Sequence, residues 1–158
     1  MTVFHGSNID FDKVSLDFAK DRRDFGKGFY TTTIREQAVL WAQDLCLRYK
    51  TEKAFLYEFE FSKINLNGKV FDGISEEWLN FIINNRIQGG IQHNYDVVQG
   101  PVANDRIYPT ITLFLNGRYD VEYTLKKLAF FKPNDQLSIH SPKALSNLVL
   151  KEKTSWKL

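Results

Sequence analysis

Two short motifs in the first 32 residues carry residue types that could bind a planar, charged ligand. His5-Gly6-Ser7 combines an imidazole, a residue without a side chain and a hydroxyl, and Gly26-Lys27-Gly28 is followed directly by Phe29 and Tyr30. A glycine at the end of a strand lets a flat ligand approach the backbone N–H and C=O groups. A neighbouring aromatic ring can stack on a flat cationic ring. Together the two motifs indicate a binding site for such a ring.

Each motif also has a purely structural interpretation. Taken alone, His5 could be a structural hydrogen-bonding residue, and a Gly-x-Gly sequence is often only a tight turn. Gly26-Lys27-Gly28 is not the dinucleotide-binding fingerprint, because the third glycine and the preceding apolar strand are missing. It is not a P-loop either, because Lys27 is not followed by Ser or Thr.

Two later segments combine a strand with polar residues. The stretch 134–140 is expected to be a turn followed by a strand, with Gln136 near the start of that strand. The stretch 95–106 is expected to be a strand that enters a Gly-Pro turn and is followed by Asp105 and Arg106. The Arg106 guanidinium could hold a pyrophosphate in a forked geometry, and Asp105 could hold a hydroxyl group. The same two residues could instead form an ion pair that caps the next helix.

Composition and length narrow the class of protein. The 158 residues predict one domain over 1–158, and the net charge of +2 with no more than two Lys or Arg in a row gives no dedicated polyanion-binding patch. The single Cys46 excludes an internal disulfide, and His93 and His140 lack partners at ligand spacing, so no metal is expected. We also expect a cytoplasmic protein with no membrane contact, because neither a signal pattern nor a long apolar run is present.

The elements that must position these residues follow from the hydrophobic pattern. Strands and helices alternate without regular βαβ spacing, which predicts the α+β class with a mainly antiparallel sheet. The segment 107–115 could be a strand or a helix, and Asn116-Gly117 ends it in either case. The expected strands are 2–5, 54–61, 95–99, 136–140 and 149–153, and the expected helices are 33–49, 75–86, 121–129 and 142–148.

Three of these elements have more specific signals. The first helix is expected to begin at a Thr33-x-x-Glu36 capping box, and Ser75 is expected to cap the second. Strand 54–61 alternates in the manner of a half-buried strand, with four aromatic residues on one face. One face of the first helix should be buried, because its apolar residues recur every three or four positions: Ile34, Ala38, Trp41, Ala42, Leu45 and Tyr49.

The order and spacing of the motifs resemble the NAD-binding core of ADP-ribosyltransferases of the His-Tyr-Glu type. More narrowly, the chain from Val3 to about Leu150 resembles the bacterial DUF3990 family. This resemblance implies an ADP-ribosyltransferase-like fold, in which a split, mainly antiparallel sheet is flanked by helices. It also implies NAD as the co-substrate.

The resemblance assigns roles to individual residues. It implies that His5 bonds the adenosine ribose, that the backbone of Gly6 bonds the nicotinamide carboxamide, and that Tyr30 stacks on the nicotinamide ring. Ser7 and Gly28 belong to the same two motifs and are expected in the NAD-binding set. Arg106 is expected to join this set at the mouth of the pocket, and Asp105 to act beside it on a ribose or an acceptor.

Gln136 occupies the position at which the transferase pattern has a glutamate. A glutamine here departs from the transferase pattern but agrees with the DUF3990 pattern. Cleavage of the nicotinamide–ribose bond develops positive charge on the ribose, which a carboxylate opposes. A glutamine keeps the hydrogen bond to the ribose but loses the charge. Asp105 or Asp135 could restore that charge, and Gln136 could also be a plain strand residue. The expected catalytic set is His5, Tyr30, Gln136 and Asp105.

The resemblance therefore predicts a toxin or effector that transfers ADP-ribose from NAD to a macromolecular acceptor and releases nicotinamide. The acceptor could be protein or nucleic acid. Family members look like toxins of toxin–antitoxin or phage-defence loci, so a cognate antitoxin protein is an implied partner. Two alternatives stay open: a non-catalytic module that binds NAD or ADP-ribose, and an NAD glycohydrolase.

Overall fold

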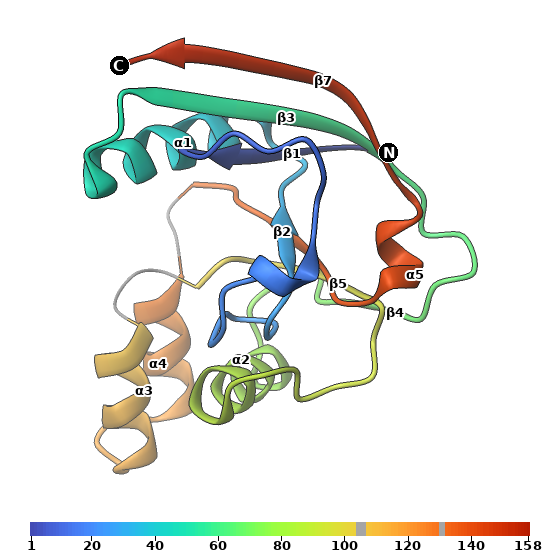
Figure 1. Cartoon of the computed structure of the whole chain (residues 1–158). Helices are drawn as coiled ribbons and strands as arrows, with labels where there is room; N and C mark the ends of the chain where they lie inside the picture. The colour runs from blue at the N-terminus through green and yellow to red at the C-terminus, as the bar shows by residue number, and fades with distance from the viewer. Residues whose placement is uncertain (104–106, 130–131) are drawn as a thin grey trace.

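The computed structural model describes residues 1–103, 107–129 and 132–158, and Asp105 and Arg106 lie outside these residues. Two sheets form the centre of the fold (Figure 1). The first is antiparallel, in the order β1 (Thr2–Ser7), β3 (Lys53–Phe61) and β7 (Leu148–Lys157). The second is mixed, in the order β2 (Phe29–Thr31), β6 (Gln136–Ile139), β5 (Val97–Gly100) and β4 (Gly68–Val70). Only β4 and β5 pair in parallel in the described residues, so the prediction of a mainly antiparallel α+β fold is confirmed.

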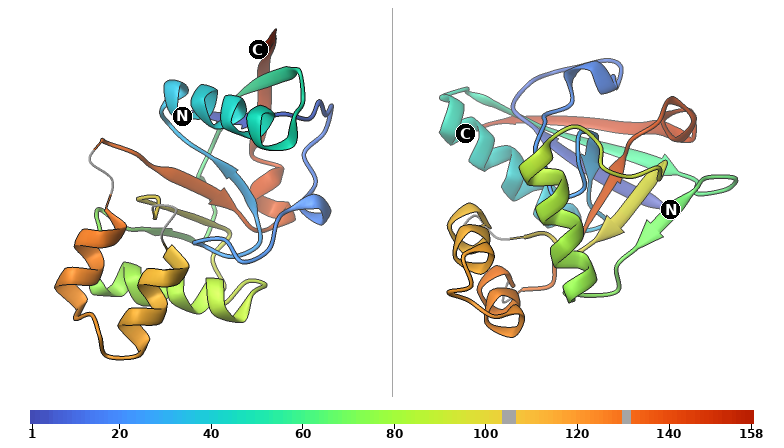
Figure 2. Two further views of the ribbon diagram at one scale, coloured as in Figure 1. Left: turned by 90° about the vertical axis from the view of Figure 1, so that its left-hand side faces the viewer. Right: turned by 90° about the horizontal axis from the view of Figure 1, so that it is seen from below.

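The helices cover both sheets. They are α1 (Arg35–Tyr49), α2 (Glu76–Gln88), α3 (Ile107–Leu115), α4 (Val121–Leu128) and α5 (Pro142–Leu145), with a short 3₁₀ helix, η1 (Leu16–Phe18), in the loop after β1. The ambiguous segment 107–115 is therefore a helix, and Gly117 follows it with a φ of 70°. Figure 2 shows α2, α3 and α4 grouped beside the four-stranded sheet, on the side away from the three-stranded sheet.

Two hydrophobic clusters hold these layers together. The first lies between the two sheets and is built mainly from aromatic residues of β3 and aliphatic residues of β5 and β6: Val3, Phe55, Tyr57, Phe59, Phe61, Val97, Leu137, Ile139 and Ala144. The second joins the other face of the four-stranded sheet to α2, α3 and α4: Phe25, Phe71, Trp78, Leu79, Ile82, Val98, Ala103, Ile107, Ile111 and Leu128. The neighbouring residues Val97 and Val98 of β5 thus face opposite clusters, as the pleat of a strand requires.

The first helix begins differently from the prediction. The Thr33-x-x-Glu36 capping box is wrong, because the N-cap residue is Ile34 and its side chain makes no capping bond. The Thr33 hydroxyl instead donates to the carboxylate of Asp135, at 2.8 Å. The side chain of Thr33, which the local sequence predicts to cap the helix, therefore makes a tertiary contact instead.

The buried face of α1 is also narrower than predicted. Trp41 and Tyr49 are exposed, at 39% and 53% of their surface, while Ala38, Ala42, Leu45 and Cys46 are buried. Small residues face the sheet because the helix packs very close to β1. A large aromatic ring would not fit at that distance, and it turns outward instead.

Other predicted boundaries moved by a few residues. β5 begins at Val97 rather than at 95, β6 ends at Ile139, and β7 continues to Lys157, beyond the predicted end at 153. The added part of β7 pairs with β3, down to Lys157 opposite Lys53. The prediction that Ser75 caps α2 is confirmed, because its side chain accepts a hydrogen bond from the N–H of Trp78.

Candidate functional site

His5 links the two strands that carry the N-terminal motifs. Strands β1 and β2 meet where Phe4 and Thr32 exchange two backbone hydrogen bonds of 2.8 and 2.9 Å. One residue beyond Phe4 in β1 and two residues before Thr32 in the chain, the Nδ1–H of His5 donates to the carbonyl oxygen of Tyr30 at 2.7 Å. The imidazole ring lies 4.5 Å from the ring of Phe29, and burial lowers the pKa of His5 to about 4, although the bond to Tyr30 opposes this. His5 is therefore neutral at physiological pH.

Gly6 is required by helix packing. A Cβ at this position would lie 2.0 Å from the carbonyl oxygen of Ala38 and 3.0 Å from the backbone nitrogen of Ala42, both in α1. The backbone N–H and C=O of Gly6 do not point toward α1. Since the N–H and C=O of Phe4 point to β2, those of Gly6, two residues on, point to the same side and are not used by the ladder with β3. Close packing against α1 thus explains why position 6 is a glycine. The N–H and C=O of Gly6 point toward the β2 side.

Tyr30 closes the glycine turn from which it emerges. Its hydroxyl donates to the carbonyl oxygen of Gly26 at 2.7 Å and accepts a hydrogen bond from the N–H of Phe25 at 3.0 Å. The ring is half-buried and packs against the cluster of α2, α3 and α4. Burial and the nearby charge of Asp24 raise the pKa of Tyr30. Tyr30 is therefore neutral and positioned by its own loop.

Two more histidines hold the same loop. The Nε2–H of His93 donates to the carbonyl of Phe25 at 2.8 Å, and the Nδ1–H of His140 donates to the carbonyl of Lys27 at 2.9 Å. Their rings meet edge to face, with centroids 4.6 Å apart. Burial lowers the pKa of both, that of His140 to about 4. A neutral His140 accepts from the hydroxyl of Ser138 through Nε2, at 2.7 Å.

Gln136 contacts a buried carboxylate that the sequence analysis did not assign to the site. Its amide nitrogen donates to Oδ2 of Asp24 at 2.7 Å and to the carbonyl of Pro101 at 3.0 Å. Asp24 is only 2% exposed. Its Oδ1 accepts from Nε and Nη2 of Arg86, at 2.8 and 2.6 Å, and its Oδ2 also accepts from the N–H of Ala103. Asp24 therefore joins β6, α2 and the loop after β5 into one hydrogen-bonded cluster.

Asp135 does not supply a charge to Gln136. Its carboxylate accepts from the Thr32 hydroxyl at 2.5 Å, and from the backbone N–H and the hydroxyl of Thr33 at 2.9 and 2.8 Å. It thus anchors the segment between β2 and α1. Of the two carboxylates considered for the missing charge, Asp105 lies outside the described residues. The carboxylate that contacts Gln136 is that of Asp24, not that of Asp135.

The remaining predicted residues have local roles in the described structure. The hydroxyl of Ser7 bonds the backbone of Ile9, 2.9 Å from its carbonyl and 3.0 Å from its nitrogen. Gly28 has no room for a side chain, since a Cβ would lie 2.7 Å from Nδ1 of His140. Asp105 and Arg106, on which part of the predicted site depends, lie outside the described residues.

The structure brings some predicted side chains together and separates others. Tyr30 and Gln136 lie on one face of the four-stranded sheet, because Phe29, Leu137 and Ile139 occupy the other. The ring of His5 lies with Phe29, on that other face. The bond from His5 to the carbonyl of Tyr30 connects the two faces.

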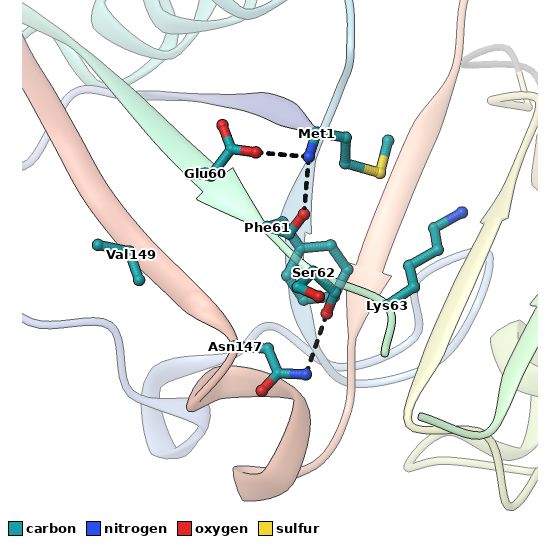
Figure 3. Close-up of a pocket in the computed structure, with 7 residues that line it drawn as sticks. All are labelled: Met1, Glu60, Phe61, Ser62, Lys63, Asn147 and Val149. Atoms are coloured by element: carbon teal, nitrogen blue, oxygen red, sulfur yellow. Dashed lines mark hydrogen bonds and ion pairs between the residues drawn. The ribbon is translucent and has the colours of Figure 1, made fainter. Parts of the chain in front are cut away.

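The surface of the described structure has cavities. One of about 460 Å³ lies at the start of β1 and is lined by none of the predicted residues: Met1, Glu60, Phe61, Ser62, Lys63, Asn147 and Val149 (Figure 3). Another, of about 310 Å³, includes Pro101, whose carbonyl binds Gln136.

In the parts of the chain that the structure describes, no group of three or more His, Cys, Asp or Glu side chains could hold a metal ion. None of the helices in those parts has the length and apolar character needed to span a bilayer.

Comparison with known proteins gives a family. The model of the family described as "Protein of unknown function (DUF3990)" matches residues 1–150. The chain belongs to the DUF3990 family. Searches of curated proteins and of solved structures gave no match.

Asp24 and Arg86 were not predicted as site residues of this DUF3990 protein, and their sequence context explains why. Asp24 stands in a charged stretch that reads as a solvated loop, and Arg86 at the end of a helix that reads as a packing element. A signal was nevertheless present, because Asp24 directly precedes the Phe25-Gly26 turn. Because Phe25 is buried, the neighbouring carboxylate of Asp24 is buried with it.

Proposed function

We propose that this DUF3990 protein is an NAD-dependent ADP-ribosyltransferase. One observation carries the proposal. Tyr30 and Gln136, which come from motifs far apart in the sequence, lie on one face of a sheet and hold adjacent residues of one loop, Phe25 and Asp24. The backbone polar groups of Gly6 point to the β2 side. His5 and Gly6 thus adjoin β2, which carries Tyr30, at the point where β1 and β2 separate, and β2 pairs with β6, which carries Gln136.

NAD would lie across this point. The N–H and C=O of Gly6 suit the two polar ends of the nicotinamide carboxamide, which needs one donor and one acceptor. The ring of Tyr30 offers a face to the cationic nicotinamide. Since His5 is neutral and donates through Nδ1, its Nε2 is left as an acceptor for a ribose hydroxyl.

The proposed reaction breaks the bond between the anomeric carbon of the ribose and the nicotinamide nitrogen. The bonding pair goes to that nitrogen, which becomes neutral, and nicotinamide leaves. The ribose develops oxocarbenium character, and a nucleophile on the acceptor attacks the anomeric carbon and loses its proton. Gln136 would accept a hydrogen bond from a ribose hydroxyl during this step, which helps to orient the developing cation.

The partners of the proposed enzyme are NAD, a macromolecular acceptor of protein or nucleic acid, and a cognate antitoxin. The acceptor follows from the proposed reaction, and the antitoxin and the toxin or effector role rest on the family resemblance alone. A non-catalytic NAD-binding module is the second candidate. It is favoured by the amide at position 136, because an amide opposes positive charge on the ribose less well than a carboxylate does.

Transfer of label tests the proposal. Purified protein is incubated with NAD labelled in the adenylate phosphate and with a bacterial lysate, with and without nuclease. We expect label on a macromolecule, and its sensitivity to nuclease tells nucleic acid from protein. The Tyr30→Ala variant should lose the label, and Tyr123→Ala, which removes an exposed tyrosine of α4, should keep it.

Other outcomes of this experiment separate the alternatives. Free ADP-ribose with no labelled macromolecule would indicate an NAD glycohydrolase. Binding of NAD with neither label transfer nor nicotinamide release would indicate a binding module. Absence of both binding and release would contradict the proposed function.

A further inference from the structure

We infer that Asp24 is a positioning residue for Gln136, and that the two side chains together do the work of one glutamate. This inference rests on the proposed function. It names a residue for which the family resemblance gave no role. It also gives a physical reason for the amide at position 136.

The contacts of Gln136 decide which way its amide is turned. A glutamine can present either its carbonyl oxygen or its NH₂ group, and only its hydrogen-bond partners choose between them. Here the nitrogen faces two acceptors, Oδ2 of Asp24 at 2.7 Å and the carbonyl oxygen of Pro101 at 3.0 Å. A carbonyl cannot donate, so the reversed amide would lose both bonds. Oε1 is therefore the atom that Gln136 can offer to a ligand.

Asp24 can impose this orientation because it is itself fixed as an acceptor. Its Oδ1 accepts from Nε and Nη2 of Arg86, and its Oδ2 accepts from the N–H of Ala103 at 3.0 Å. All of these partners are donors, so both carboxylate oxygens of Asp24 act as acceptors. Gln136 consequently presents an acceptor oxygen, as a glutamate would, with a carboxylate directly behind the amide.

The same contact explains why a glutamate would fit poorly. A carboxylate at position 136 would place an oxygen where the amide nitrogen now lies, next to Oδ2 of Asp24. Two carboxylates at such a distance cannot both ionise without a large cost, and one of them takes up a proton. The charge of the site is thus held at position 24, and an amide is the side chain at 136 that suits it.

The experiment moves the carboxylate between the two positions. The wild type, Asp24→Asn, Gln136→Glu and the double variant Asp24→Asn/Gln136→Glu are compared for the rate of nicotinamide release at saturating NAD and for NAD affinity. Asp17→Asn, which changes an exposed aspartate in η1, is the matched control. Thermal melting of each protein shows which variants are folded.

We expect Asp24→Asn to lower the rate on the order of 10²-fold, with NAD affinity within about threefold, because the loss concerns the reacting ribose. Gln136→Glu should also be slower than wild type. The double variant should be faster than either single variant, because the carboxylate at 136 then faces an amide at 24. A merely structural role for Asp24 would not give this rescue.

Two results of this experiment would overturn the inference, and they have different consequences for the proposed function. If the wild type releases nicotinamide and folded Asp24→Asn is as fast, Asp24 does not position the site, while the proposed function stands. If the wild type neither binds NAD nor releases nicotinamide, the proposed function fails and this inference fails with it.

A measurement on the wild type covers the case in which the variants do not fold. NMR follows the side-chain amide hydrogens of Gln136 while the non-hydrolysable analogue carba-NAD is added. We expect both hydrogens to stay protected from exchange with water, because Asp24 and Pro101 keep them. Loss of their protection on binding would show that the amide turns to donate to the ligand, and would overturn the inference.

Discussion

The imidazole Nδ1 of His5 lies 2.7 Å from the carbonyl oxygen of Tyr30, directly beyond the last backbone contact between β1 and β2. This bond joins two motifs that are 25 positions apart in the chain. It also spans the place where the two strands separate. The proposed NAD site depends on this geometry, and the following predictions test the parts that maintain it.

Gly6→Ala should destabilise the protein strongly, because the new Cβ would lie 2.0 Å from the backbone oxygen of Ala38. Helix backbone cannot move as a flexible side chain can, so α1 must shift, at a cost of about 3 kcal/mol or more. Urea unfolding measures the loss. The control is Gly73→Ala, where a Cβ meets nothing within 4 Å, and equal stability of the two variants would contradict the packing described for β1 and α1.

Tyr30→Phe should separate the two roles of Tyr30. The variant loses the hydroxyl that bonds Gly26 and Phe25, so stability should fall by about 1–3 kcal/mol. The ring remains, so nicotinamide release at a temperature below the transition should fall far less than in Tyr30→Ala. Thermal melting and a nicotinamide assay measure the two effects. Equal loss of activity in both variants would argue against stacking as the function of the ring.

Arg86→Met should cost about 3–5 kcal/mol, since it leaves the buried Asp24 without its cationic partner. For a chain of this size the midpoint of thermal unfolding should fall by roughly 10 °C. Lys126→Met is the control, because it removes a lysine from an ion pair whose side chains are 70% and 80% exposed. That variant should change stability by less than about 0.5 kcal/mol, and a similar loss in both variants would contradict the account of the Asp24 cluster.

Stability should fall in mild acid partly through His140. Burial lowers its pKa in the folded protein to about 4, whereas the unfolded side chain has a value near 6.5. The unfolded state therefore takes up the proton first as pH falls. The stabilisation due to neutral His140 is complete above about pH 6.5 and is lost as pH falls through about 4, with a size on the order of 3 kcal/mol.

The His140→Asn variant isolates this contribution. Asparagine can keep a donor toward the carbonyl of Lys27 but does not titrate. We expect the variant to be less stable than wild type near pH 7 and to lose less stability between about pH 6.5 and about pH 4.5. Urea unfolding across this range measures both slopes, and parallel curves would show that His140 does not control the acid response.

The parts of the fold that depend on local pattern were predictable. The Ser75 cap, the alternating strand 53–61 and the helix 121–128 follow from neighbouring residues, and the structure has them near the predicted bounds. The start of α1 was not predictable, because the hydroxyl of Thr33 bonds Asp135, about a hundred positions away. Local propensity contains no information on such a partner.

The candidate site likewise has residues that were predicted from the sequence and residues that were not. The residue types pointed to His5, Gly6 and Tyr30, and the family resemblance pointed to Gln136. The role of Asp24 depends on a side chain from β6 and another from α2 that meet it only after folding. Likewise, the missing side chain of Gly6 was interpreted as space for a ligand, whereas α1 occupies that space. Tertiary contacts decided both points.

The most direct test of the proposed site is a crystal structure of the protein with carba-NAD bound. We predict that the nicotinamide carboxamide bonds the N–H and C=O of Gly6, that the ring lies on Tyr30, and that a ribose hydroxyl contacts Oε1 of Gln136. Carba-NAD bound elsewhere, such as in the cavity lined by Met1 and Glu60, with these three residues untouched, would contradict the account.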